Sequence, residues 1–540
     1  MACLWEKDLS VETDDMEENS LVVYGFKRVI ITVTAVICAL LQIIDTTIVN
    51  IALPTMQGSL GASLTEITWV ITAYAIANVI VMPMTSWLSQ QFGRRNYFAA
   101  SIIIFTFTSW ACGNATSINE LIIFRFIQGI GGGALLVTAQ TIITESYPIE
   151  KRAMAQTIYV LGVIVGPTLG PPLGGWIVDN YSWPYIFYIN IPVGVIATLL
   201  TLQFVKSPKF AEKVKARHVD WLGIFLLIVA IGSLQFILEK GQEDDWFNSN
   251  LITTLSVICF FGFYFFIWRE LVYKHPIVEL RVLKDRNLSI GSILSFVLGF
   301  GLFGSTFIIP LYTQTIMGWT ALQAGWLMIP STIFTAIMMP FVGKMMEKGV
   351  PFRYLITTGM IIFFIYSMMA YKILTPNTGS DAFFWILVIR GIGLGLLSIP
   401  VTTLALSTLQ GAAIGQGAAI SGMMRQLGGS FGVAIISTFL VRDNQFHRSD
   451  LLINMDVTNP KVQQRIEALS RGFQGKGMPW DVARKTAISL QERLVDVQAT
   501  VLSYMDVFLW IGVMFLVCVP FVIIFVKKSR QKVSMSHVGE

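Results

Sequence analysis

Charged residues are scarce in this chain of 540 residues. Asp, Glu, Lys and Arg together make up 13% of it, whereas a soluble protein carries about 25%. Hydrophobic residues make up 54% of the chain. This balance excludes an ordinary soluble domain and predicts an all-α polytopic membrane protein. The formal net charge of +5 is small for a chain of this length, and we expect no nucleic-acid partner.

Reactive and metal-binding motifs are also missing. The cysteines are too few and too scattered for a disulfide framework or a metal cluster: Cys3, Cys38, Cys112, Cys259 and Cys518. The sequence has no P-loop, no HExxH and no GxSxG pattern. We therefore expect no metal site, no organic cofactor, no enzymatic activity and no ATP hydrolysis within this chain.

Residues 1–24 are acidic and polar, and lack the basic segment and apolar core of a cleavable signal peptide. Beyond them the chain contains fourteen apolar runs near the ~20 residues that cross a bilayer as a helix. These predicted spans are 28–53, 67–88, 97–114, 119–143, 153–178, 184–205, 220–239, 251–270, 288–313, 322–346, 353–373, 382–408, 412–441 and 506–527.

Basic residues cluster in alternate short loops, which the positive-inside rule places in the cytoplasm. They are Arg94 and Arg95, Lys151 and Arg152, five residues within 206–217, five within 269–286, and Lys344, Lys348 and Arg353. This assignment puts both termini in the cytoplasm and segment 442–504 outside. Periodic apolar residues in that segment, such as Leu490 and Leu494, predict helical pieces there.

The chain also repeats itself at a constant offset of eight spans. Arg125 in span four has a counterpart at Arg390 in span twelve, and the loops after spans two and ten match in the same way. We therefore predict two six-helix halves, with two extra central helices between them. The predicted domains are a cytoplasmic tail 1–24, a first half 25–206, a linker with both extra spans 207–286, a second half 287–528 and a tail 529–540.

Span five has an unusual composition, because glycine recurs at every fourth residue: Gly162, Gly166, Gly170 and Gly174. On a helix this spacing makes one stripe without side chains, against which another helix packs closely. Pro167, Pro171 and Pro172 lie in the same stretch and predict a kink. Ordinary tight packing without a functional role is the alternative interpretation.

Asp45 lies within span one, where a charged side chain costs at least ~2.5 kcal/mol and must face the protein interior or water. At 1.5 Å per residue it lies ~13 Å below the outer end of its span, and Arg125 lies ~9 Å below the outer end of span four. We therefore predict that the two side chains approach each other and serve proton coupling. A permanent structural ion pair is the alternative.

The second half lacks this acid, since Gly301 stands where the repeat would place a partner for Arg390. Arg425 in span thirteen is a further intramembrane cation, either paired with backbone carbonyls or facing a cavity. Of these, structural pairing is the favoured interpretation. Gln128 stands one helical turn from Arg125, and either hydrogen-bonds beside it or serves helix packing. Glu145 is expected to be solvated at the inner end of span four.

Four motifs make the chain resemble the major facilitator superfamily, specifically its fourteen-span drug–proton antiporters of the EmrB/QacA kind. The first runs from Leu41 through Asp45 to Pro54. The second is the span-four motif Arg125, Gln128, Gly129 and Gly131; the third is the antiporter motif Gly162, Gly166, Pro167, Gly170, Gly174 and Gly175; the fourth starts at Arg425. The loop after span two keeps Gly93, Arg94 and Arg95 but has Gln90 in place of the family's acid.

The resemblance implies a major facilitator fold and proton-coupled export of small amphipathic or hydrophobic compounds, with the proton as coupling ion. It further implies that the antiporter motif lies at the junction where the two halves meet, where its packing seals the site in one state and yields in another. It also implies a bacterial inner (plasma) membrane, a lipid bilayer as surroundings, and in some members a periplasmic adaptor with an outer-membrane channel. Two other functions stay open. One is proton-coupled transport of a specific metabolite, lipid or fatty acid, and the other is a non-transporting membrane receptor.

Overall fold

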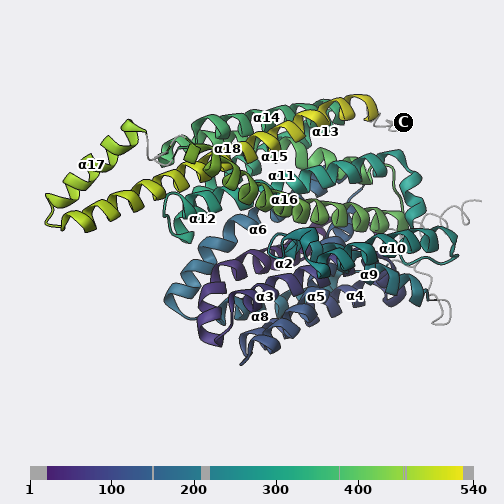
Figure 1. Ribbon diagram of the computed structural model, residues 1–540. Coiled ribbons are helices and arrows are strands. Elements are labelled where there is room, and N and C mark those ends of the chain that lie inside the picture. Colours follow the sequence, from purple (N-terminus) through teal and green to yellow (C-terminus); the bar gives the residue numbers. More distant parts are fainter. Residues whose placement is uncertain are drawn as a thin grey trace, which may run out of the picture.

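The computed structural model describes residues 21–148, 151–207, 219–375, 378–453, 455 and 459–526. In these ranges the chain is helical, with two short 3-10 turns and no strand (Figure 1). Most of the tail 1–24, the basic linker residues 208–218 and the whole tail 529–540 lie outside the described residues.

The first group of helices, here the N-terminal bundle, comprises α2 (Gly25–Leu60), α3 (Leu64–Phe92), α4 (Arg94–Gly113), α5 (Ile118–Ser146), α6 (Arg152–Asn180), α7 (Tyr185–Tyr188) and α8 (Asn190–Phe204). The central pair is α9 (Trp221–Lys240) and α10 (Asn250–Val272), with the 3-10 turns η3 (Trp246–Asn248) and η4 (Leu280–Lys284). The second group, the C-terminal bundle, comprises α11 (Arg286–Thr315), α12 (Ala321–Leu327), α13 (Ile329–Glu347), α14 (Phe352–Ile373), α15 (Ser380–Leu406), α16 (Ala412–Ile453), α17 (Pro460–Gln474) and α18 (Trp480–Phe525).

Every predicted apolar run is helical, but a count of fourteen spans is not confirmed. In the described part of the chain twelve helices are long and apolar enough to cross a bilayer, or thirteen if the bent α6 counts as one span. The helix outside this set is α4, whose 20 residues begin with Arg94, Arg95 and Asn96 and include several hydroxyl side chains. These polar residues lower its hydropathy, although it packs within the N-terminal bundle against α5 and α8.

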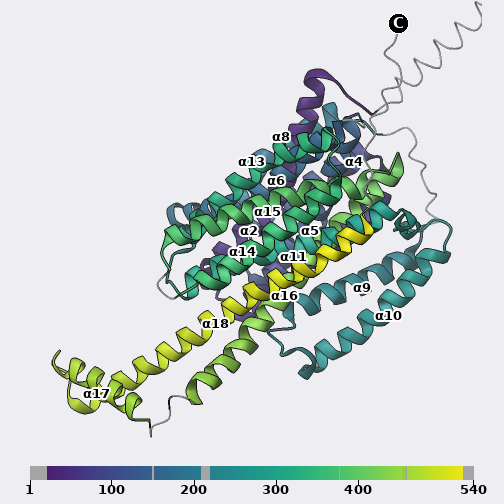
Figure 2. The ribbon, with the colours of Figure 1, turned by 90° about the horizontal axis from the view of Figure 1, so that it is seen from above.

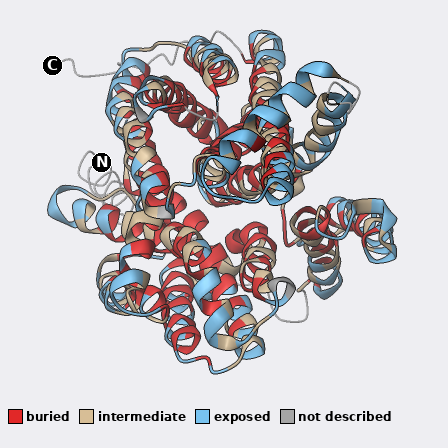
Figure 3. Ribbon diagram, turned by 60° about the vertical axis from the view of Figure 1, so that its left-hand side comes forward, coloured by how far each residue is buried: buried red, intermediate tan, exposed pale blue. Residues whose placement is uncertain are grey.

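The two bundles lie against each other, and the central pair lies at one side of them (Figures 1 and 2). Contacts between the bundles come from α6 with α12, α13 and α15, and from α16 with α3 and α5. Helix α9 packs against α10, α3 and α16 and so touches both bundles. Buried residues concentrate where helices face one another, whereas the outer surface is exposed (Figure 3).

One hydrophobic cluster joins the two bundles at the end where the basic loops lie. It contains Ile31, Ala153 and Tyr159 from the N-terminal bundle together with Met346 and Leu409 from the C-terminal bundle. A second cluster lies entirely in the C-terminal bundle and a third entirely in the N-terminal bundle, around Ile48 and Phe187. A further cluster joins Val79 of α3 and Ile420 of α16 to the central pair. The bundles therefore share apolar contacts at the predicted cytoplasmic end and along the central pair, and each also has a core of its own.

Helices α16 and α18 extend far beyond the bundle, with α17 at their tip (Figure 2). Their 42 and 46 residues correspond to ~63 and ~69 Å at 1.5 Å per residue, about twice the ~30 Å of a hydrocarbon core. The prediction of helical structure within 442–504 is confirmed in its described part.

The loop between α3 and α4 corrects one expectation about charge. Gly93 adopts a φ of 82°, which favours glycine, and this sharp turn starts α4 at Arg94. Arg94 forms an ion pair with Glu145 on α5, and both side chains are 7% exposed. The expectation that Glu145 is solvated is wrong, because the inner end of α5 is covered by neighbouring elements and a buried carboxylate needs a cation. Arg94 thus finds an acidic partner although Gln90 replaces the family's acid.

We predict that Arg94→Gln or Glu145→Gln lowers the free energy of unfolding by ~3 kcal/mol, because either change leaves an uncompensated buried charge. Thermal unfolding of purified protein in detergent measures this loss. The matched control is Arg95→Gln, since Arg95 is exposed next to Arg94 and its removal should matter by at most ~0.5 kcal/mol. Equal melting of Arg94→Gln and Arg95→Gln would contradict a stabilising role for the pair.

Candidate functional site

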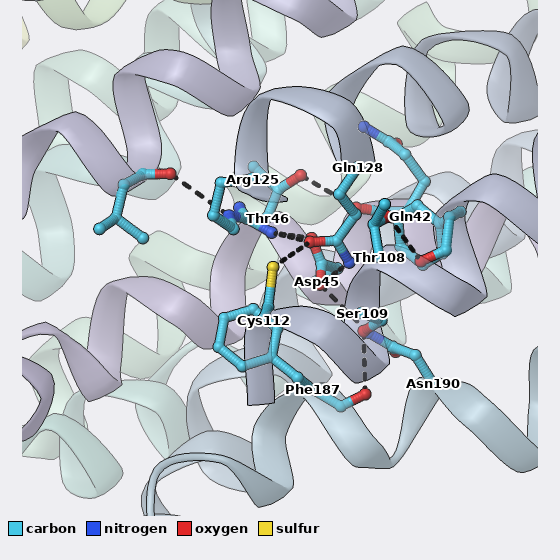
Figure 4. A network of polar contacts seen from close by, with 12 residues as sticks. Gln42, Asp45, Thr46, Thr108, Ser109, Cys112, Arg125, Gln128, Phe187 and Asn190 are labelled. Carbon is cyan, nitrogen blue, oxygen red and sulfur yellow. Dashed lines mark hydrogen bonds and ion pairs between the residues drawn. The ribbon is translucent and has the colours of Figure 1, made fainter. Parts of the chain in front are cut away.

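Asp45 and Arg125 meet in the centre of the N-terminal bundle, which confirms their predicted approach. Arg125 Nη1 on α5 donates to Asp45 Oδ2 on α2 at 2.6 Å (Figure 4). The side chains are 1% and 0% exposed. Both charges are thus withdrawn from solvent and depend on one another, since each would be costly to bury alone.

Two amides complete the surroundings of the carboxylate (Figure 4). Gln128 Nε2 and Asn190 Nδ2 each donate to Asp45 Oδ1 at 3.1 Å. Gln128 also accepts from Arg125 Nη1 through its Oε1 at 2.8 Å. Asn190 is the first residue of α8 and also donates to Ser109 of α4. Helices α5 and α8 therefore contact Asp45 of α2 directly, and α4 joins the network through Ser109. The contact between Gln128 and Arg125 agrees with the expectation from the span-four motif.

Sequence reasoning missed three of the neighbours. Asn190 and Ser109 are polar residues inside apolar runs, and that isolation is the signal which could have identified them. Tyr74 of α3 places its ring 4.1 Å from the Arg125 guanidinium, a cation–π contact. Nothing in the local sequence around Tyr74 indicates this contact, because it depends on how α3 packs against α5.

The arrangement can couple a proton to packing. An ionised carboxylate only accepts hydrogen bonds, whereas a proton on it removes the negative charge of the ion pair and turns one of the two acceptor oxygens into a donor. Arg125 would keep Gln128 Oε1 and the Val70 carbonyl, to which its Nε donates at 3.3 Å. Protonation of Asp45 would therefore weaken the contact between α2 and α5, while Arg125 would still have two acceptors.

The second half lacks the acid, as predicted. Arg390 of α15 is buried and donates to the hydroxyls of Ser305, Thr306 and Ser331 at 2.7–2.9 Å. No carboxylate lies within ion-pair distance of it in the described ranges. A Cβ at Gly301 would overlap the ring of Phe515, so this position has no room for an aspartate.

The glycine stripe of α6 faces α2 of its own bundle, not the C-terminal bundle. Cβ atoms added at Gly162, Gly166 and Gly174 would lie 2.8, 2.6 and 2.7 Å from side-chain atoms of Val36, Ile43 and Ile48, all on α2. A Cβ at Gly170 would overlap Thr47 Oγ1. The stripe thus holds the helix that carries Asp45, and the idea that its glycines lie at the junction of the halves is corrected.

The prolines and Gly175 occupy the other side of the same helix. Pro171 and Pro172 contact Gly325 of α12, and Gly175 faces Leu322. Helix α6 bends by 40° between Pro167 and Leu169, which confirms the predicted kink. Helix α6 therefore packs its glycines against α2, and Pro171 and Pro172 against the C-terminal bundle.

A cavity of about 40 Å³ lies between the two bundles, and α2 lines it with the neighbours of Asp45 rather than with Asp45 itself. Gln42 and Thr46, on either side of Asp45 along α2, line it together with Tyr159 of α6 and with Phe303 and Arg425 of the C-terminal bundle. Arg425 therefore faces this cavity, and within the described ranges its side chain makes one hydrogen bond, from Nη2 to the Tyr159 hydroxyl at 3.5 Å. The favoured expectation of pairing with backbone carbonyls does not describe this side chain.

Comparison with known proteins gives the same fold and adds relatives. A family model described as Major Facilitator Superfamily matches residues 35–433. The multidrug export protein EmrB of Escherichia coli (strain K12) is 36% identical over 454 residues, 84% of this chain and 87% of that protein. The fatty acid resistance protein FarB of Neisseria gonorrhoeae is 32% identical over 502 residues, 91% of this chain and 95% of that protein.

The chain belongs to the major facilitator superfamily. Solved structures agree on the fold. The human organic anion transporter MFSD10 superposes with a TM-score of 0.54 at 11% identity, over 91% of this chain and all of that one. A bacterial homologue of the human lysosomal transporter Spinster superposes with a TM-score of 0.52 at 17% identity, over 94% of this chain and all of that one.

The superfamily motif of α5 packs where its glycines are needed. A Cβ at Gly129 would collide with the Tyr74 carbonyl of α3, and one at Gly131 would lie 2.8 Å from the Ser101 carbonyl of α4. These close approaches draw α3 and α4 onto α5. This packing places Tyr74 beside Arg125 and Ser109 beside Asn190. The motif therefore supplies the charge of Arg125 and also positions the helices that surround Asp45.

We predict that Gly170→Leu abolishes proton-driven exchange or makes the protein leak protons, while leaving membrane insertion intact. The added side chain must push Thr47, and with it the turn that follows Asp45, away from α6. Proton flux in everted vesicles measures this effect. Gly58→Leu is the control, since a Cβ at Gly58 meets nothing within 4 Å. Normal exchange by Gly170→Leu would support packing without a transport role.

Proposed function

We propose that this protein is a proton-coupled antiporter that exports amphipathic or hydrophobic compounds by alternating access. The observation that carries the proposal is the buried Asp45–Arg125 pair beside a cavity between two bundles. The named relatives are multidrug export and resistance proteins, which supports export of drug-like compounds. No residue needs to form or break covalent bonds in a substrate for this work.

The cycle follows from the position of Asp45. A proton arriving from outside neutralises the carboxylate and ends the ion pair with Arg125. Helix α2 then moves relative to α5, and the glycine contacts carry this movement to α6, whose proline side meets α12 of the other bundle. The bundles rock about the cavity, as in other transporters built from two halves. Proton release restores the ion pair once the cavity opens to the cytoplasm.

The small volume of the cavity agrees with a cycle in which the bundles move apart. At about 40 Å³ it has room for a few water molecules, whereas sites for drug-sized ligands measure about 300–1,000 Å³. The bundles must therefore separate around the cavity to admit a substrate. The shared hydrophobic cluster at the predicted cytoplasmic end is the part that has to open for loading.

A specific metabolite, lipid or fatty acid transporter is the second candidate, and the resemblance to FarB favours it among the alternatives. A non-transporting receptor has less support, because it needs neither a buried ion pair nor a cavity between two bundles. We propose the inner membrane of a bacterium as the location, with both termini in the cytoplasm.

We further propose that the rod formed by the outer parts of α16 and α18 with α17 docks a periplasmic adaptor that leads to an outer-membrane channel. Apolar side chains are exposed along this rod, among them Phe446 (69%) and Ile453 (73%). Such side chains on a segment that projects into water are typical of an interaction surface.

For coupling, we expect Asp45→Asn to insert normally and to lose proton release upon substrate addition, down to about a tenth or less of the wild-type signal, since an amide has no titratable proton. Everted vesicles with a pH-sensitive dye measure this. Asp381→Asn is the control, because Asp381 is exposed at the start of α15. If abundant Asp45→Asn protein still carries out proton-driven efflux, the pair is a permanent structural ion pair and has no coupling role.

For the rod, we expect Phe446→Glu with Ile453→Glu to lower drug resistance of whole cells several-fold, while transport in everted vesicles stays unchanged. Docking would be lost but the bundles would remain intact. Gln445→Glu adds the same charge at an exposed neighbouring position and serves as the control. Equal resistance of the double variant and the control would show that the rod is a simple extracellular cap.

A further inference from the structure

Besides Arg94, which pairs with Glu145, three arginines are buried within the two bundles, and among the described residues they differ in how their donors are used. Arg125 pairs with Asp45 and bonds to Gln128 and to a backbone carbonyl. Arg390 donates to three hydroxyls. Arg425 has one long contact of 3.5 Å with Tyr159, at the limit of a hydrogen bond. A guanidinium carries five N–H donors, so most of those on Arg425 are open.

These open donors face the central cavity. The side chains that line it are uncharged apart from Arg425, among them Gln42, Tyr159, Met82, Val163 and Phe303. Within the described ranges no carboxylate forms an ion pair with Arg425. The carboxylate of nearby Asp45 is held by Arg125, Gln128 and Asn190 instead. The cavity therefore carries one uncompensated positive charge.

A second unsatisfied group lies in the same wall. The Oε1 atom of Gln42 is buried and has no hydrogen-bond partner among the described residues. Buried polar groups without partners cost free energy until a ligand or water supplies the bond. This oxygen is an acceptor, so it takes the bond from water or from a donor group of the ligand and not from an anionic headgroup. The other walls are apolar, with Met82, Val163 and Phe303 among them. A polar end and an apolar lining match the two ends of an amphipathic molecule.

We infer that the cavity binds amphipathic anions, and that Arg425 holds their acidic headgroup while the apolar walls take the hydrophobic part. This inference rests on the proposed export function and adds the substrate's charge to it. A guanidinium binds a carboxylate or sulfonate through charge-assisted hydrogen bonds. A cationic amphipath in the same place would meet like-charge repulsion in a low-dielectric setting. Binding of the anion supplies the partner that the chain itself does not provide for Arg425.

The test uses two probes with the same twelve-carbon tail and permanent charges of opposite sign, radiolabelled dodecanesulfonate and dodecyltrimethylammonium. Permanent charges prevent passive accumulation along a pH gradient. Everted vesicles containing the full-length protein are energised, and uptake of each probe is measured alone and in competition. The variants are Arg425→Gln, Arg425→Lys and Arg442→Gln. The last is the control, since Arg442 is exposed on the same helix α16 outside the cavity.

We expect the wild type to concentrate the sulfonate in preference to the quaternary amine. Arg425→Gln should lower sulfonate uptake about tenfold, in line with the loss of a hydrogen bond to a charged group. It should raise amine uptake, because the like-charge repulsion is removed. Arg425→Lys should retain most sulfonate uptake because it keeps the charge, and Arg442→Gln should behave as wild type.

Two results would overturn the inference while leaving export intact. One is equal or preferential uptake of the amine by the wild type, which needs no variant to fold. The other is an equal loss of both probes in Arg425→Gln, with Arg425→Lys equally inactive, which would make Arg425 a structural residue. Uptake of neither probe by the wild type, together with no proton release for any amphipath, would instead refute the proposed function, and this inference with it.

Discussion

The pairing of Asp45 with Arg125 is the constraint around which the N-terminal bundle is built. Neither charge is tolerable alone at 0% and 1% exposure, and a buried pair broken at one partner costs about 3–5 kcal/mol. Helices α2 and α5 are therefore fixed in depth and rotation relative to each other. The amide of Gln128 adds a second contact between α5 and the carboxylate, and the amide of Asn190 fixes α8 against it. A proton is the smallest ligand able to release this arrangement, because it changes the charge without requiring space.

Helix α2 connects this pair to everything else the transporter needs. One face presents Asp45 to α5, and a neighbouring face lays Ile43, Thr47 and Ile48 on the glycine stripe of α6. Gln42 and Thr46 reach the cavity between the bundles. A change in the charge of Asp45 thus acts on a helix that already touches the substrate space and the helix contacting the second bundle. No separate signalling path is required, since one rigid element has all these contacts.

Much of the fold could be predicted from sequence because a membrane helix needs a long apolar run, which the composition shows directly. The helical ranges, the kink in α6, the depth match of Asp45 with Arg125 and the missing acid near Arg390 follow from apolar length, proline, residue counting and an internal repeat. The direction of the glycine stripe did not follow, since spacing shows that a face is bare but not which helix covers it. Glu145 and Asn190 were misjudged or missed for a related reason, as their partners lie on helices distant in sequence.

The two halves differ in the partners of their matched arginines, and this difference suggests different roles for the two bundles. Both bundles keep an arginine at the matched position, yet Arg125 faces a carboxylate and Arg390 faces hydroxyls. Hydroxyl partners do not titrate near neutral pH, so the contacts of Arg390 persist through a proton cycle. The C-terminal bundle is then the fixed partner, which offers α12 to the prolines of α6 and Arg425 to the cavity. In the proposed cycle, movement driven by protons originates in the N-terminal bundle, and the C-terminal bundle supplies Arg425 as the charge that would bind the substrate.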